Sequence, residues 1–105
     1  MARFVFAYHG GPQSMTPEEG RAHMGRWMAW MNGLGDAVVD RGLPVGKSMT
    51  VGPDGVTEGG GPNPLSGFTI VEAGDMAAAL EMAKLCPHID IDGTIEVAPA
   101  LDMPM

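Results

Sequence analysis

The chain has 105 residues, with six Lys and Arg against thirteen Asp and Glu, which gives a formal net charge of −7 at neutral pH. This length favours one domain over residues 1–105, and the acidic balance argues against nucleic-acid binding, which needs a basic face. One cysteine excludes an intrachain disulfide. No apolar run approaches the roughly 18 residues of a membrane span, and the N-terminus does not resemble a secretory signal. We therefore expect a cytoplasmic protein that binds neither nucleic acid nor membranes.

The first part of the chain predicts a strand and then a long helix. Residues 3–8 (RFVFAY) are aromatic and β-branched, as is typical of a strand. Thr16 as N-cap, Pro17 at the first helical position and Glu19 as partner of the N-cap form a strong helix start. We expect this helix to end at about Gly33–Gly35.

At 100° per residue, one arc of this helix collects apolar side chains and predicts its buried face. Trp27 lies nearer the centre of the arc than Trp30, so we expect Trp27 to be the more buried of the two. The residues on the arc are Met24, Trp27, Met28, Met31 and Leu34.

The second part of the chain predicts further strands and one helix. Residues 37–40 fit either a short strand or the tail of the helical region, and residues 47–51 have strand composition, followed by a turn at Pro53-Asp54-Gly55. Residues 67–72 predict a strand and Asp75 caps a second helix that ends near Cys86-Pro87. Residues 93–97 predict the last strand, and residues 100–105 a loosely held tail.

The element order β-α-β-β-α-β predicts an α+β protein of the ferredoxin-like class, an antiparallel sheet with both helices on one face. The predicted strands offer apolar residues to both faces, whereas the helices cover only one. We therefore expect a homodimer in which a second copy of the chain covers the other face.

The chain resembles the YCII-related (DGPF-type) family of the dimeric α/β-barrel superfamily. The resemblance lies in the order and spacing of the segments RFVFAY, 16-TPEEGRAHMGRWMAWM-31, 67-GFTIVEAGDMAAALEMAKLCPHID-90 and 93-GTIEVAPA-100. The Asp-Gly-Pro-Phe signature itself is absent, and 58-EGGGPNPLSG-67 stands in its place. The resemblance implies a homodimer with a pocket that holds a histidine and an aspartate and carries out acid–base chemistry.

His23 is the first candidate catalytic residue, in the stretch Ala22-His23-Met24 that the resemblance matches. It flanks the apolar arc between Trp27 and Trp30, where desolvation or Glu19 would shift its pKa. A shifted imidazole near neutrality suits a general acid or base. The structural alternative is a boundary histidine that makes one hydrogen bond.

His88 and Asp90, in 86-CPHIDID-92, form the second candidate group, because a loop after a helix is a natural place for pocket residues. Asp90 is the first choice as the carboxylate that orients His23, and Asp40 the second. The alternatives are a polar turn for the first pair and a solvated strand end for Asp40.

These residues leave two functions open. In the first, Met24, Trp27, Trp30 and Asp40 line a pocket for a small, partly apolar molecule, and His23, His88 and Asp90 catalyse an isomerisation or elimination without a cofactor. In the second, the dimer binds a metabolite or another protein without catalysis. No His-x-x-x-His or His-x-Glu spacing occurs, so we expect no metal.

Overall fold

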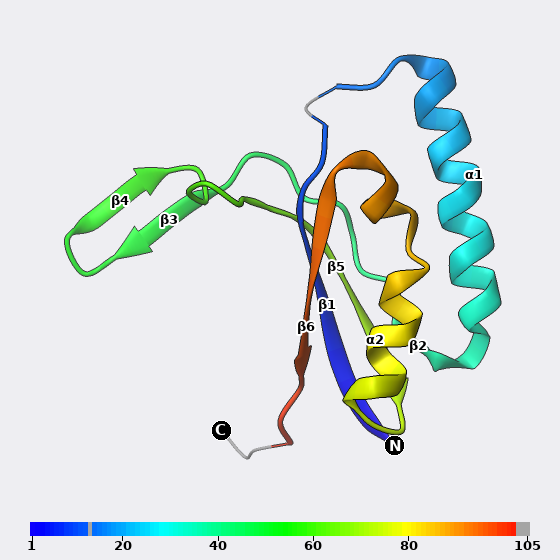
Figure 1. Ribbon diagram of the computed structural model, residues 1–105. Helices are drawn as coiled ribbons and strands as arrows, with labels where there is room; N and C mark the ends of the chain where they lie inside the picture. The colour runs from blue at the N-terminus through cyan, green and yellow to red at the C-terminus, as the bar shows by residue number, and fades with distance from the viewer. Residues whose placement is uncertain (13, 103–105) are drawn as a thin grey trace.

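The computed structural model describes residues 1–12 and 14–102 and shows an α+β protein with two α-helices, a four-stranded antiparallel sheet and a small two-stranded sheet (Figure 1). Of the predicted tail, residues 103–105 lie outside the described part, and Ala100 N–H still donates a 2.9 Å hydrogen bond to the carbonyl of Arg3. The elements in chain order are β1 (Ala2–Gly10), α1 (Pro17–Leu34), the 3₁₀ turn η1 (Gly35–Ala37), β2 (Val38–Asp40), β3 (Met49–Gly52), β4 (Gly55–Glu58), β5 (Leu65–Ala73), α2 (Met76–Lys84), the 3₁₀ turn η2 (Pro87–Ile91) and β6 (Gly93–Pro99).

The main sheet has the strand order β2-β5-β1-β6. β1 lies in its middle, where Phe6 faces Thr69 of β5 on one side and Val97 of β6 on the other. Because the register is antiparallel throughout, side chains that are neighbours across strands point to the same face.

The strand predicted at residues 47–51 does not join this sheet. It begins at Met49 as β3 and pairs with β4 through the turn predicted at Pro53-Asp54-Gly55. The short β2 forms an edge of the main sheet instead, next to β5. It lies in residues 37–40, which the sequence allowed to be either a short strand or the tail of the helical region. A local hairpin closes a shorter loop than a pairing with a distant strand, and its turn signal is strong.

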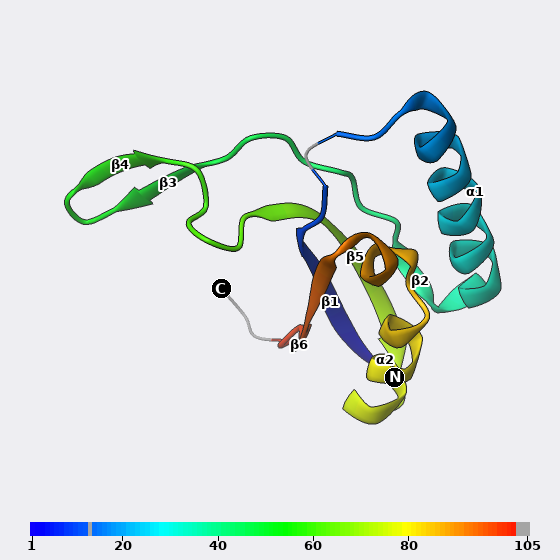
Figure 2. The ribbon, with the colours of Figure 1, turned by 45° about the horizontal axis from the view of Figure 1, so that its top comes forward.

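The core lies on one face of the main sheet. Phe4, Phe6 and Tyr8 of β1 alternate toward this face and are buried together with Val71 of β5. Figures 1 and 2 show α1 and α2 on this same side of the sheet. The helices contribute their own buried side chains to the core: Trp30, Met31, Ala79 and Ala83.

The helix α1 is rotated relative to the predicted arc, so the prediction that Trp27 is more buried than Trp30 is wrong. Trp30 is only 9% exposed, and its indole N–H donates a 3.0 Å hydrogen bond to the carbonyl of Met82 in α2. Met24 and Met28 are exposed. The position of α2 decides this rotation, because it buries the Trp30 side of α1. The inward stripe of α1 consists of His23, Trp27, Trp30, Met31 and Leu34.

Both helix starts have the predicted caps. The Thr16 hydroxyl accepts from the N–H of Glu19, and the Glu19 carboxylate accepts from the N–H of Thr16, at 3.1 and 2.9 Å. Asp75 accepts from Ala78 N–H at 2.9 Å and begins α2. No helix in the described ranges combines the length and the apolar character needed to cross a membrane.

Two features lie on the side of the sheet away from the helices. The outer face, as we name it, carries the half-buried apolar side chains of Val5, Ala7, Phe68 and Ile70. The arm, defined as the hairpin β3–β4, extends away from the body on this same side (Figures 1 and 2).

Candidate functional site

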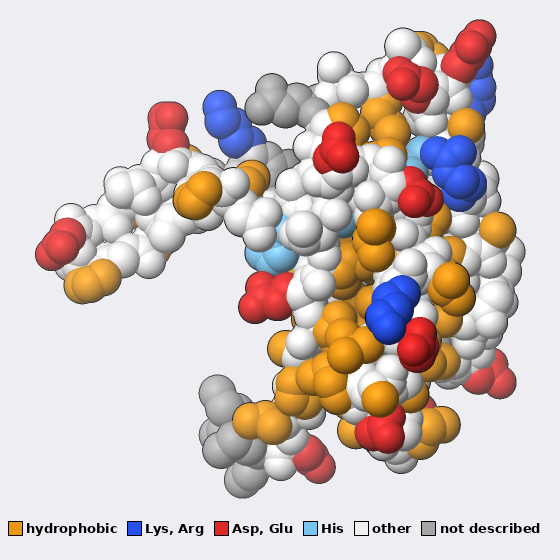
Figure 3. Space-filling view, in the orientation of Figure 1, with side chains coloured by type: hydrophobic (Ala, Val, Ile, Leu, Met, Phe, Trp, Pro, Cys, Tyr) orange, Lys and Arg blue, Asp and Glu red, His pale blue; other side chains and the backbone are white. Residues whose placement is uncertain are grey.

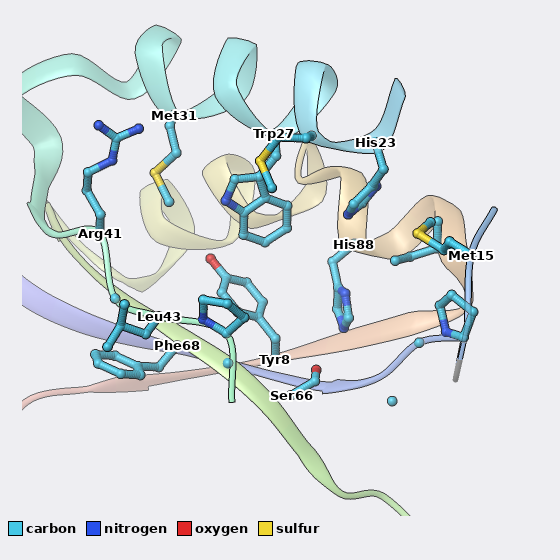
Figure 4. Close-up of a pocket in the computed structure, with 18 residues that line it drawn as sticks. Tyr8, Met15, His23, Trp27, Met31, Arg41, Leu43, Ser66, Phe68 and His88 are labelled. Atoms are coloured by element: carbon cyan, nitrogen blue, oxygen red, sulfur yellow. The ribbon is translucent and has the colours of Figure 1, made fainter. Parts of the chain in front are cut away.

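A cavity of about 410 Å³ opens between α1 and the end of the main sheet at which β1 finishes and β5 begins (Figure 4). This volume lies within the range of small-molecule pockets. The lining residues come from β1 and the segment after it (Tyr8, Gly10, Gly11, Pro12, Met15), α1 (His23, Met24, Trp27, Met31), the segment after β2 (Arg41, Gly42, Leu43, Pro44), β5 (Ser66, Gly67, Phe68) and η2 (His88, Ile91).

His88 is held in one orientation at the wall of this cavity. Its side chain is buried, and Nε2 lies 2.9 Å from the backbone carbonyl oxygen of His9. A carbonyl only accepts, so Nε2 carries a hydrogen and donates it to this carbonyl. The ring lies directly against Gly93, where a Cβ would overlap it. The Cε1–Nδ1 edge faces Gly11 in the cavity wall.

His23 extends from α1 toward His88, as Figure 4 shows. Its ring packs against Trp27 with centroids 5.8 Å apart, and its Nδ1 is buried with no hydrogen-bond partner in the described part of the chain. Burial lowers the pKa of His23 from the ordinary 6.5, and the charges of Arg26 and His88 act in the same direction. His23 is therefore mostly a neutral imidazole at pH 7, and its buried Nδ1 is free to bond a ligand.

A chain of hydrogen bonds crosses the floor of the cavity. The Tyr8 hydroxyl donates to the Thr69 hydroxyl at 2.7 Å, and Thr69 donates to the backbone carbonyl of Arg41 at 3.1 Å. Burial raises the pKa of the Tyr8 phenol far above its ordinary value, so it stays protonated. Tyr8 also packs edge-on against both Trp27 and His88, with centroids 5.1 and 5.5 Å apart. The phenol thus links the aromatic wall to the backbone at Arg41.

Ser66 brings another polar group to the cavity. The pairing of β1 with β5 shifts between Tyr8 and His9, because Tyr8 faces Gly67 and His9 faces Leu65. Ser66 is the extra residue of this bulge, and bulges re-aim side chains. Its hydroxyl is buried without a hydrogen-bond partner among the described residues and points toward the cavity (Figure 4).

The structure brings together four of the seven predicted site residues. His23, His88, Met24 and Trp27 line the cavity. Trp30 lies outside the lining, in the core between the two helices.

The two predicted carboxylates also lie outside the lining. Asp40 uses one carboxylate oxygen to accept from Gly42 N–H at 2.8 Å, which is a turn interaction. Asp90 is exposed, and no hydrogen bond joins it to an imidazole within the described residues, although its charge acts to raise the pKa of His23.

Sequence reasoning did not identify Tyr8, Arg41 or Ser66 as site residues. The sequence could have indicated Tyr8. It is the last of the alternating residues Phe4, Phe6 and Tyr8, and it places a hydroxyl group at the end of an apolar strand face. No sequence pattern indicated Ser66 or Arg41. The bulge at Ser66 and the course of the chain at Arg41, after the three-residue β2, both depend on the pairing of distant strands.

No protein-family model matches this chain, and no curated protein matches it in sequence. Within residues 1–12 and 14–102, no three His, Cys, Asp or Glu side chains converge as ligands for a metal ion. The site must therefore be interpreted from its own geometry.

Proposed function

We propose that the protein is a cofactor-independent enzyme that uses paired imidazoles for acid–base chemistry on a small, partly apolar metabolite, in an isomerisation or elimination. The observation that carries the proposal is the meeting of His23 and His88 at one cavity. They lie 65 residues apart in sequence, and each ring keeps a nitrogen that has no hydrogen-bond partner within residues 1–12 and 14–102.

The two histidines are suited to complementary roles. The carbonyl of His9 fixes the His88 tautomer, so its Nδ1 acts as a base without first changing its proton arrangement. The lowered pKa of His23 keeps that ring neutral near pH 7, ready to accept a proton and return it. Asp90, the predicted partner of His23, would act here through its charge, which favours the protonated imidazole.

Exchange of substrate hydrogens for solvent deuterium tests the proposal without knowledge of the substrate. A panel of small ketones, lactones and enols is incubated with protein in heavy water and followed by NMR. We expect exchange above background, reduced by about 10²- to 10⁴-fold in His23→Gln or His88→Gln.

The control is Asp36→Asn, because Asp36 is exposed in η1 and lies outside the cavity lining. This variant should exchange like the wild type. Compounds that bind the cavity but never exchange would contradict catalysis.

The alternative function is binding without catalysis, either of a small molecule or of another protein. The observation that favours it is the composition of the lining, which contains no carboxylate. Binding in the deuterium experiment, with equal and negligible exchange in the wild type and all variants, would support this alternative.

We also propose that the chain is a divergent relative of the YCII-related family with a ferredoxin-like fold. The strand order β2-β5-β1-β6, the antiparallel pairing and the placement of both helices on one face support this assignment. The arm would then be an insertion between the second and third strands of that fold. The place where the family signature would fall, residues 58–67, spans the return from this arm into β5.

A homodimer that buries the outer face is part of the same proposal. The chain exposes 7288 Å², whereas a compact monomer of this mass exposes about 5,600 Å². The difference, about 1,700 Å², is comparable to what one subunit covers in a large interface. The apolar outer face and the arm both contribute to this excess.

The arm supports a second copy as the occupant of that face. Within the part of the chain that the structure describes, β3 and β4 pair only with each other. An isolated two-stranded hairpin is marginal in water. Apolar side chains are exposed on the arm (Figure 3), and Val51 is 79% exposed. Because the arm extends on the outer-face side, a second sheet stacked there would lie beside it and cover these side chains.

A further inference from the structure

The charged, aromatic and neutral polar side chains of the cavity lie in different parts of it. Their order indicates which chemical groups a ligand would carry, and where. In Figure 4, Arg41 lies at one end, His23 and His88 lie toward the other, and the rings of Tyr8 and Trp27 lie between. A ligand that fills this space meets a cation first, then an aromatic wall, and then neutral hydrogen-bonding groups.

Arg41 is an exposed cation that has no anionic partner among the described residues. None of the ion pairs within residues 1–12 and 14–102 includes it, and the polar contact of its guanidinium there is a 3.6 Å approach to the sulfur of Met28. Thioether sulfur is a weak acceptor, so the five guanidinium N–H groups stay available.

The backbone that carries Arg41 is fixed on three sides. Its carbonyl accepts from Thr69, and the next residue, Gly42, donates to Asp40. Gly42 has φ +70° and lies so close to the carbonyl of Phe68 that no Cβ would fit. A turn with this support can direct an arginine at a ligand with little loss of backbone entropy on binding.

At the other end, Ser66 Oγ and His23 Nδ1 are buried without a hydrogen-bond partner in the described part of the chain, and both residues line the cavity. An unsatisfied buried polar atom is costly, which makes a hydrogen-bonding occupant favourable. The hydroxyl both donates and accepts, and the neutral ring nitrogen does one or the other. Carbonyl or hydroxyl oxygens on the ligand satisfy both.

We infer that the cavity takes a small organic carboxylate, whose carboxylate group pairs with Arg41 while a carbonyl or hydroxyl group at its far end binds Ser66 and His23. The middle of such a molecule is flat and apolar, to pack against Trp27 and Tyr8. The planar guanidinium matches a carboxylate through two parallel hydrogen bonds. This inference rests on the cavity being the ligand site of the proposed function, and it does not depend on catalysis.

Matched pairs of acids and their primary amides test the charge requirement. The probes are 4-hydroxybenzoate with 4-hydroxybenzamide, and 4-formylbenzoate with 4-formylbenzamide, titrated by NMR against the indole signals. Trp27 lines the cavity, whereas Trp30 lies outside the lining and bonds to Met82, so the Trp27 signal should move more. We expect each acid to bind about tenfold or more tightly than its amide.

Arg41→Gln should abolish the preference for the acid, and Arg21→Gln, an exposed arginine of α1 outside the lining, should preserve it. Equal binding of acid and amide in the wild type would overturn the carboxylate inference and leave the ligand site standing. If no probe moves the Trp27 signal at millimolar concentration, both the inference and the small-molecule site are overturned.

Discussion

At the scale of single residues, position and burial separate the three histidines into different roles. His9 is the half-buried partner of Glu96, the Nε2 of His88 is held by a backbone carbonyl, and His23 is a partly desolvated ring with a buried Nδ1. The same type of side chain therefore meets three different environments, which depend on its position in the fold.

The lowered pKa of His23 makes stability depend on pH. In the unfolded chain His23 titrates near 6.5, so below that pH the unfolded state binds more protons than the folded state. The contribution of His23 to the free energy of unfolding is therefore complete above pH 6.5. It is lost as the pH falls from 6.5 through the lower pKa that His23 has in the folded protein. Urea unfolding at pH 7.5 and pH 5 should show a smaller loss of stability in His23→Gln than in the wild type. The same loss in both proteins would show that the imidazole is not desolvated.

At the scale of elements, the rotation of α1 and the path after β2 determine the site. Turning α1 toward α2 puts Trp30 into the core and leaves Trp27 and His23 at the cavity. The short β2 releases the chain early, so that Arg41 and the three residues after it form a cavity wall rather than continuing a strand.

The rotation of α1 predicts unequal costs for its two tryptophans. Trp30→Ala should lower the free energy of unfolding by about 3–5 kcal/mol, because it removes a buried indole and its hydrogen bond to Met82. Trp27→Ala should cost less, since Trp27 is only partly buried at the cavity wall. Denaturant unfolding of both variants measures the difference. A larger loss of unfolding free energy in Trp27→Ala than in Trp30→Ala would contradict this rotation of α1 and support the one predicted from the apolar arc.

At the scale of the whole molecule, the arm and the outer face make the chain extended. Its radius of gyration is 14.9 Å, whereas a compact domain of this length has about 13 Å. The outer face and the arm both expose apolar side chains, and both are surfaces that a second copy of the chain would cover. The extended shape is therefore consistent with the proposed homodimer.

The dimer can be tested through the arm, because the arm pairs with no other strand in the described ranges. Sedimentation equilibrium of the wild type should give about 22 kDa, twice the 11.0 kDa of one chain. Val51→Glu combined with Val56→Glu should weaken the dimer, because it would bury charges against the partner. Leu85→Glu, at an exposed position after α2, should leave the dimer intact. A mass of 11 kDa for the wild type at micromolar concentration would refute the dimer.

The sequence by itself determined what local chemistry controls. The caps at Thr16 and Asp75, the turn at Pro53-Asp54-Gly55 and the alternation in β1 each follow from interactions over a few residues, and all are present. It also identified His23, His88, Met24 and Trp27, since a histidine beside an apolar stripe or after a helix lies near an interface between core and solvent.

Only the tertiary structure decided the rest, because the deciding contacts join distant segments. The packing of α2 against α1 buries Trp30 rather than Trp27 in the core. The bulge between β1 and β5 orients Ser66 toward the cavity. The Tyr8–Thr69–Arg41 chain spans three segments, and no local pattern encodes it. Side-chain periodicity shows that a helix has an inward face, whereas the neighbours that pack against it determine which residues that face buries.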